Sequence, residues 1–397
     1  MPGFEIFGEE EREQVNHVLE TGVLFRYGFD GARQGHWKAK TFEAELARRL
    51  GLKYAHLCAS GTAALSTAMA ACGIGAGDEV IVPPFTFVAT IESVLMAGAV
   101  PVFADIDETL CLSPEGLEAA LTPATKAVVP VHMCGAMARI DEIKSICDRK
   151  GLILLEDACQ SVGASYHGKA LGSFGKAGCF SFDPVKTITC GEGGAVVTND
   201  RDVYIAADAY ADHGHDHIGN DRGAEDHLIL GANYRISELN AAVGLAQLRK
   251  LDRILETQRR NKAAIKSAMA DIRGIAFRYL PDPEGDSATF LTFFMPNLET
   301  ARQAVKALTA AGVDGCFHWF DNKWHYIRKW NHLHAMQTPA RLAVQTLANC
   351  PDYRAISLPE SDAIMQRAIS MQIKLGWTPE QLDQRTRATV KALRTLI

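Results

Sequence analysis

The sequence lacks the patterns that mark a secreted or nucleic-acid-binding protein. Its ten cysteines include no CxxC pair, so we expect reduced and mostly buried thiols instead of a disulfide framework. No block rich in lysine and arginine occurs and the net charge is −6, which disfavours a partner with a phosphate backbone. These absences predict a protein that binds no nucleic acid.

Neither export nor membrane insertion is indicated. Residues 1–10 are acidic where a signal peptide is basic and then apolar. The longest apolar stretch, from Thr86 to Ile106, contains Glu92 and Pro101, which is typical of a buried helix followed by a strand. We therefore expect a cytoplasmic protein with no membrane partner.

What the chain does contain is a regular alternation of short apolar runs and helical patterns. Its 397 residues are 47% hydrophobic and 22% charged, enough for a large core and more than one domain. Residues 100–106, 126–131 and 152–156 are predicted strands, with helices over 114–121 and 139–150 between them. Continuous apolar strands separated by helices predict an α/β fold whose mostly parallel central sheet is sandwiched by helices.

The pattern changes after a long helix predicted from Ser237 to about Gln258. Beyond it, helices accompany sparse strands, such as one around residues 290–294. We predict a large domain over residues 1–250, which includes an N-terminal helical segment, and a smaller α/β domain over residues 251–397. Because open parallel sheets bind ligands beyond the carboxyl ends of their strands, polar residues that follow strands are candidate site residues.

Two such segments suit a phosphate and a pyridine ring. Ser60-Gly61-Thr62 opens a helix, where free N–H groups and the positive end of the helix dipole favour a phosphate; an ordinary capped helix is the alternative. Asp157 ends a predicted strand, and a carboxylate there can keep a pyridine nitrogen protonated. Many strand-end aspartates only cap the next helix, so Asp157 alone is weak evidence.

Lys186 is the candidate for covalent chemistry. It lies between Ser181, whose hydroxyl can share the phosphate, and glycines 191, 193 and 194, which permit close approach of a flat ring. A lysine in a tight and partly desolvated site can lose its proton, attack an aldehyde and later move a proton. Most lysines are solvated surface charges, but the ordered set of phosphate helix, aspartate and lysine favours an aldehyde cofactor.

Over essentially its whole length the chain resembles the DegT-type sugar aminotransferases, which are fold type I enzymes dependent on pyridoxal 5′-phosphate. The segments that carry this resemblance are Ser60-Gly-Thr-Ala-Ala-Leu65, Pro83-Pro-Phe-Thr-Phe-Val-Ala-Thr90, Glu156-Asp-Ala-Cys-Gln160, Ser181-Phe-Asp-Pro-Val-Lys186, Gly191-Glu-Gly-Gly-Ala-Val-Val-Thr-Asn199 and Asn233-Tyr-Arg-Ile-Ser-Glu-Leu-Asn-Ala-Ala242. They occur in the order that the family has.

The resemblance implies a role for each matching residue. Lys186 would be the Schiff-base lysine and Asp157 the partner of the pyridinium nitrogen. Gln160 would lie by the ring hydroxyl and Phe87 would stack on the ring. The expected phosphate ligands are Gly61, Thr62 and Ser181, joined by Asn233 from the other subunit of a homodimer with shared active sites and, with less support, by Arg235.

The resemblance also implies the reaction class. One subgroup of the family carries histidine in place of the lysine and dehydrates its sugar, whereas this chain keeps Lys186. We therefore expect transfer of an amino group, usually from glutamate in this family, to a sugar carbonyl. A non-catalytic regulatory or binding protein with the same fold is the alternative.

The expected sugar follows from two departures from the family pattern. Most relatives act on nucleotide-linked keto sugars and carry a Tyr-Pro-x-Pro-Leu-His-like segment, but residues 315–326 here read Gly-Cys-Phe-His-Trp-Phe-Asp-Asn-Lys-Trp-His-Tyr. The entry loop, Phe25-Arg26-Tyr27, also departs from the family, where small and polar residues are common. Together with residues 212–217, these segments resemble one subgroup of the family. That subgroup aminates the C8 aldehyde of oxidised Kdo, an eight-carbon sugar acid of lipopolysaccharide, and forms 8-amino-3,8-dideoxy-manno-octulosonate. A nucleotide-linked keto sugar is the alternative substrate.

A sugar acid needs cations and hydrogen-bond donors for its carboxylate. Arg26, His318 and Lys323 are the candidates for substrate binding, against the simpler interpretation of each as a surface or core residue. His213, His215 and His217 alternate with Asp212 and Asp216, which could bind a transition metal. The family has a His-Gly loop at this point without a metal, so we predict a loop that shapes the site, with no metal.

Overall fold

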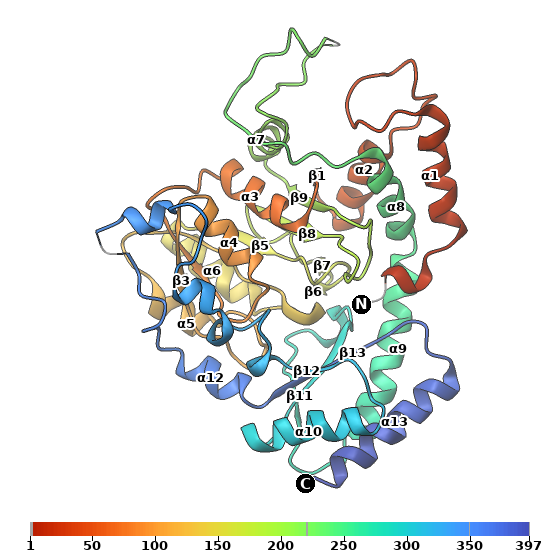
Figure 1. The fold of residues 1–397 in the computed structure, drawn as a ribbon, viewed down its shortest axis with the longest axis vertical. Coiled ribbons are helices and arrows are strands. Elements are labelled where there is room, and N and C mark those ends of the chain that lie inside the picture. The colour runs from red at the N-terminus through yellow and green to blue at the C-terminus, as the bar shows by residue number, and fades with distance from the viewer. Residues whose placement is uncertain (1–2, 220, 349, 397) are drawn as a thin grey trace.

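Two β-sheets organise the chain in the computed structural model, which describes residues 3–219, 221–348 and 350–396. Figure 1 shows the larger sheet with its helices in one half of the molecule and the smaller sheet with α10 and α13 in the other. Met1 and Pro2, part of the acidic start, lie outside the described residues.

The larger sheet has the strand order β1-β9-β8-β5-β4-β2-β3. Pairing is parallel from β8 to β3, whereas β9 runs antiparallel to both of its neighbours. The predicted α/β fold with a mostly parallel sheet is therefore confirmed. The strands are β1 (Tyr54–Cys58), β2 (Glu79–Val82), β3 (Val100–Phe103), β4 (Thr125–Val128), β5 (Ile153–Asp157), β8 (Ala177–Ser181) and β9 (Gly194–Thr198); a separate hairpin contains β6 (Ser165–Tyr166) and β7 (Lys169–Ala170).

Helices cover the large sheet, and four of them begin at a side chain that caps the helix. Ser60, Ser113, Asp200 and Ser237 each accept a hydrogen bond from a backbone N–H of the first turn of the helix that follows. The helices are α1 (Glu9–Thr21), α2 (Lys38–Leu50), α3 (Gly61–Ala71), α4 (Ala89–Met96), α5 (Pro114–Ala120), α6 (Ile140–Lys150), α7 (Arg201–Ala211) and α8 (Glu238–Arg249).

The smaller sheet is antiparallel, with the order β10-β11-β13-β12, and packs against α9, α10 and α13. Its strands are β10 (Ala276–Phe277), β11 (Phe290–Phe294), β12 (Cys316–His318) and β13 (Ala368–Gln372). The remaining helices are α9 (Leu251–Met269), α10 (Leu298–Ala310), α11 (Asn331–His334), α12 (Pro359–Met365) and α13 (Pro379–Arg394). Short 3-10 turns are η1 (Gly3–Ile6), η2 (Met133–Gly135), η3 (Pro283–Gly285), η4 (Trp319–Asp321), η5 (Ile327–Lys329) and η6 (Ala343–Thr346).

The single helix predicted from Ser237 to about Gln258 is wrong, because α8 and α9 are separate helices that meet at Lys250. The Lys250 ammonium donates to the carbonyl of Ile6 and to Glu11 of α1. These partners are more than 200 residues away in sequence, so a local helical pattern could not reveal the break. A domain boundary after residue 250 stays a prediction, and α9 begins at Leu251.

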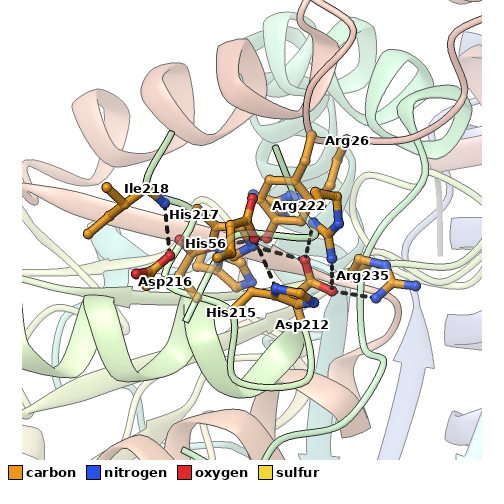
Figure 2. A network of polar contacts seen from close by, with 12 residues as sticks. Arg26, His56, Asp212, His215, Asp216, His217, Ile218, Arg222 and Arg235 are labelled. Atoms are coloured by element: carbon orange, nitrogen blue, oxygen red, sulfur yellow. Dashed lines mark hydrogen bonds and ion pairs between the residues drawn. The ribbon is translucent and has the colours of Figure 1, made fainter. Parts of the chain in front are cut away.

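Two loops that project from the large sheet are joined by a buried polar network (Figure 2). His217 lies 3.0 Å from Asp208 of α7 and 2.9 Å from Asp212, and its ring stacks on Tyr27 of the other loop. Although burial opposes the charged form, the two carboxylates raise the pKa of His217 to about 9. The imidazolium therefore ties the 212–232 segment to residues near Arg26.

Asp212 is the anionic centre of this network. It is fully buried, accepts hydrogen bonds from Arg222 and Arg235, and its pKa is lowered despite burial by His217 and these arginines. His215 pairs instead with Glu225. Within the described ranges, no three histidine, cysteine, aspartate or glutamate side chains are grouped as metal ligands.

No helix in the described part of the chain is long and apolar enough to cross a bilayer.

The η2 turn joins the two halves of the molecule. Gly135 has φ +80°, and its carbonyl accepts from the backbone N–H and the hydroxyl of Ser287, at 3.0 and 2.9 Å. Arg278 donates to the carbonyl of Met133 at 2.8 Å. A Cβ at Gly135 would overlap the hydroxyls of Ser287 and Thr289, so only glycine fits this junction.

We expect Gly135→Ala to lower the free energy of unfolding by about 3 kcal/mol, because it adds steric overlap to an unfavourable φ. Gly151→Ala is the matched control: Gly151 has φ +68° with no atom near its missing Cβ, so about 1 kcal/mol is expected. Denaturant unfolding measures both values. An equal loss of unfolding free energy in the two variants would show that the junction with Ser287 and Thr289 tolerates a methyl group.

We expect the His217 network to stabilise the fold below a pH of about 6.5 and to lose this contribution as pH rises through about 9. The sign follows because the folded state holds the proton of His217 more tightly than the unfolded state. The thermal midpoint should fall more between pH 7 and pH 10 for the parent protein than for His217→Asn. The thermal midpoint of the control variant His332→Asn, at an exposed site, should change with pH as that of the parent does. An equal fall in the thermal midpoint for the parent and for His217→Asn would contradict the assignment.

Candidate functional site

A cavity of about 720 Å³ lies beyond the carboxyl ends of β5 and β8 and is closed by residues of the smaller domain. It brings together most of the predicted cofactor ligands. Those that line it are Gly61, Thr62, Phe87, Asp157, Gln160, Ser181 and Lys186.

The first turn of α3 and the end of β8 form one end of this cavity. Ser60 caps the helix by accepting from the N–H of Ala63, which leaves the first amides and the Thr62 side chain at the cavity. A Cβ at Gly61 would lie 2.6 Å from Cβ of Ser181 and 2.9 Å from its hydroxyl oxygen. The absence of a side chain at Gly61 therefore allows the Ser181 hydroxyl to lie beside the helix N-terminus, an arrangement suited to a phosphate.

Asp157 is held rigidly at the end of β5. One of its carboxylate oxygens accepts from the Thr90 hydroxyl at 2.7 Å and the other from the backbone N–H of Cys159 at 3.1 Å. The Thr90 hydroxyl is in turn 2.7 Å from that of Thr86. The carboxylate is almost fully buried yet lines the cavity, so it can pair with a buried cationic ring nitrogen.

Lys186 lies on the turn that follows β8, and only 7% of it is exposed. Its Nζ is 3.5 Å from a carboxylate oxygen of Asp183, and its backbone carbonyl accepts from the N–H of Gly3 at 3.3 Å. The turn is therefore fixed at both its backbone and its side chain. A buried amine on a cavity wall has the setting required of a nucleophilic lysine.

Gln160 and Phe87 provide two further walls. The Gln160 side-chain oxygen accepts from the N–H of Cys134 at 3.1 Å, which orients its amide NH₂ group for donation elsewhere. The ring of Phe87 is 39% exposed and lies 5.7 Å from the ring of His325. An exposed aromatic face on a cavity wall suits stacking against a flat ligand.

The sequence did not predict the wall that the segment around β12 contributes. Residues 315–326 depart from the family pattern, but this departure does not indicate which of them line the cavity. They are Phe317, Trp319, Asn322, Trp324 and His325, and Glu192 lines it from the large domain. Burial, followed by the charge of Lys186, lowers the pKa of His325 to about 4, so this imidazole is neutral at pH 7.

The three predicted substrate ligands lie outside the set that lines the cavity. Arg26 is buried and donates to the carbonyl of Leu57 and to Glu43. His318 is 3.0 Å from both Asp321 and the carbonyl of Gln366. Lys323 is exposed, between Asn322 and Trp324, which do line the cavity.

Asn233, the predicted phosphate ligand in trans, is exposed and does not line the cavity of its own chain. Its backbone pairs with that of Asp212 in an isolated bridge, and Arg235 is bound to the Asp212 side chain. Both residues follow directly on the 212–232 segment and contact Asp212 of the His217 network.

The residues present fit pyridoxal 5′-phosphate. The helix N-terminus with the Ser181 hydroxyl matches its phosphate, Asp157 its ring nitrogen and Lys186 its aldehyde, all in one cavity. Of four cysteines near this site, Cys58, Cys179 and Cys190 are buried and Cys159 is partly buried. Desolvation raises the pKa of each of these thiols.

The sequence of this chain is also similar to those of named enzymes. An L-glutamine:2-deoxy-scyllo-inosose aminotransferase from Streptomyces kanamyceticus is 37% identical over 75% of this chain and 71% of its own length. Two enzymes of the same name, from Streptomyces paromomycinus and Streptoalloteichus tenebrarius, are 43% and 39% identical, and the chain spans 62% of the length of each.

Solved structures agree in fold across nearly the whole chain. An aminotransferase from Psychrobacter cryohalolentis is 28% identical with a TM-score of 0.84, covering 98% of both chains. The DesV protein of S. venezuelae, solved with a ketimine intermediate, is 28% identical with a TM-score of 0.81, covering 97% of this chain and 94% of its own.

The family comparison covers residues 6–388, almost the whole chain. This protein therefore belongs to the DegT/DnrJ/EryC1/StrS aminotransferase family, whose members depend on pyridoxal 5′-phosphate.

Proposed function

We propose that this aminotransferase moves an amino group from glutamate to a polyhydroxylated carbonyl compound that carries no nucleotide, with the C8 aldehyde of oxidised Kdo as the acceptor. The product would be 8-amino-3,8-dideoxy-manno-octulosonate. The observation that carries the reaction class is the buried Lys186 amine in one cavity with Asp157 and the N-terminus of α3.

Each residue of the site has a defined task. When bound, pyridoxal 5′-phosphate supplies an electron sink for negative charge at the donor α-carbon. Asp157, oriented by Thr90 and the N–H of Cys159, holds the ring nitrogen in its protonated form. Lys186 would anchor the cofactor and, when free, would move a proton from the donor α-carbon to the cofactor in the first half-reaction and from the cofactor to the former carbonyl carbon of the acceptor in the second. Replacement of this lysine by histidine would favour dehydration, and its presence disfavours a purely regulatory role.

The charges that line the cavity support an acceptor without a diphosphate. Among the described lining residues there is one lysine and no arginine, while Asp183 and Glu192 supply carboxylates beyond Asp157. Two carboxylates repel a diphosphate but accept hydrogen bonds from sugar hydroxyls. Of the predicted substrate ligands we retain Lys323 for the acid group, because Arg26 and His318 already pair with protein groups.

A second acceptor is favoured by the relatives. Enzymes 37–43% identical to this chain are named for 2-deoxy-scyllo-inosose and L-glutamine. Neither of these two substrates is a nucleotide. The alternative acceptor for the same cavity is therefore a cyclic polyhydroxylated ketone, with glutamine as the amino donor.

We also propose a homodimer in the cytoplasm. Asn233 would reach the phosphate of the neighbouring subunit, since it is exposed on a projecting segment outside its own cavity. The same segment exposes Leu228 and Leu230, apolar side chains suited to a protein interface. All ten cysteines are free thiols, which suits a reducing compartment.

We expect Lys186→Ala to lower kcat by roughly a thousandfold, because it removes both the anchor and the proton carrier. Borohydride should fix pyridoxal phosphate covalently to the parent chain at Lys186 and give no adduct at this site in the variant, as mass spectrometry of peptides shows. Lys176→Ala, at an exposed lysine paired with Asp200, is the control and should behave as the parent. A cofactor adduct on another lysine of the parent would refute the assignment.

We expect the enzyme to aminate the C8 aldehyde of Kdo with glutamate and to leave nucleotide-linked 4-keto sugars unchanged. Chromatography of the aminated products measures turnover of each acceptor. A third reaction, of 2-deoxy-scyllo-inosose with glutamine, is measured in the same way. Lys323→Ala should raise the KM for the sugar acid by about tenfold and leave the KM for the neutral ketone unchanged. Turnover of the nucleotide sugars alone would overturn the proposed acceptor class.

A further inference from the structure

An indole side chain is left exposed at the cavity that holds the reaction. Trp324 is 67% exposed and yet lines the cavity together with the cofactor ligands. Tryptophan has the largest apolar surface of any side chain, and its exposure beside a cavity is typical of a ligand contact. The fold does not require this indole for its core, because the neighbouring Trp319 and Tyr326 are buried there instead.

The backbone around Trp324 is fixed relative to the cofactor wall. The N–H of Trp324 donates to the side-chain oxygen of Asn322 at 2.7 Å. The carbonyl of His325 accepts from the N–H of Thr86 at 2.9 Å, and Tyr326 forms a β-bridge with Phe85. These contacts join the segment directly to the one that carries Phe87, so the backbone that carries the indole is held at a set place relative to the Phe87 wall.

Polar groups face the same space. Asp183 and Glu192 offer carboxylates, and the side-chain amides of Asn322 and Gln372 line the cavity as well. An aromatic face together with several hydrogen-bonding groups fits a saturated ring that has C–H bonds on one face and hydroxyls around its rim. The aromatic side chain packs against the C–H face, and carboxylates and amides bind the hydroxyls.

We propose that Trp324 is the residue that determines acceptor specificity, by stacking on the C–H face of a polyhydroxylated ring without a nucleotide. This assignment rests on the proposed function, and it identifies the subsite that this function leaves open. The amino donor is a small open-chain amino acid and offers no such face, so Trp324 serves the second half of the reaction only.

The experiment separates the two half-reactions in the holoenzyme. Bleaching of the cofactor absorbance by glutamate or glutamine reports the donor half, and product formed from the Kdo aldehyde or 2-deoxy-scyllo-inosose reports the acceptor half. We expect Trp324→Ala to raise the acceptor KM by about tenfold with the donor half unchanged, and Trp324→Phe to restore most of the loss. Trp377→Phe is the control, since Trp377 packs under Arg385 of α13.

Binding without turnover gives a second readout. Calorimetric titration of the holoenzyme with each acceptor, in the absence of a donor, should show a Kd about tenfold higher for Trp324→Ala than for the parent. An unchanged acceptor Kd, or an equal loss in both half-reactions, would overturn the assignment. If the parent protein shows no donor half-reaction, the proposed function fails, and the titration still decides whether Trp324 binds the ring.

Discussion

The site depends on the close approach of the first turn of α3 to the end of β8. Cys58 at the end of β1 pairs with Gly194, and Ser181 pairs with the same glycine from the other side. A Cβ at Gly194 would overlap the backbone of Ser60, and one at Gly61 would lie 2.6 Å from Ser181. Two glycines thus let a helix N-terminus and a strand end meet, and the free amides of the helix face the same space as the Lys186 turn.

Several buried charged groups of this molecule are held by fixed partners. Asp157 is fixed by a hydroxyl and an amide, and Glu156 beside it accepts from three backbone N–H groups of residues 172–175. Asp212 is surrounded by two arginines and an imidazolium. Because an unpaired buried charge is costly, such fixed partners also keep each carboxylate in one orientation. In Asp157 this orientation is what the proposed pairing with a ring nitrogen requires.

The sequence predicted the parts of the site that are local. Asp157 ends β5, and Gly61 and Lys186 lie in the segments that follow β1 and β8. Parallel strands end at one edge of a sheet, so the proximity of these residues follows from the order of the elements. Arg26 and His318 were chosen by residue type, and the structure places both against protein partners, Glu43 and Asp321 with Gln366. The pairing of Arg26 with Glu43 depends on the packing of a loop on α2, which local sequence does not encode. The break between α8 and α9 lies at Lys250, whose partners Ile6 of η1 and Glu11 of α1 are likewise distant in sequence.

The segment around β12 supplies what distinguishes this cavity from a general cofactor pocket. The larger sheet and its helices provide the N-terminus of α3, Asp157 and Lys186, the predicted cofactor ligands. The residues of this segment that line the cavity, Phe317, Trp319, Asn322, Trp324 and His325, add aromatic rings, an amide and one neutral imidazole. They contribute contact surface, and the exposed Lys323 beside them supplies positive charge. The wall is attached to the Phe85–Phe87 segment by backbone hydrogen bonds, and η2 attaches Gln160 to Ser287 through Cys134 and Gly135. The surface that selects the acceptor is therefore positioned by the same segments that position the cofactor, so a change in this wall can alter the acceptor while the chemistry stays the same.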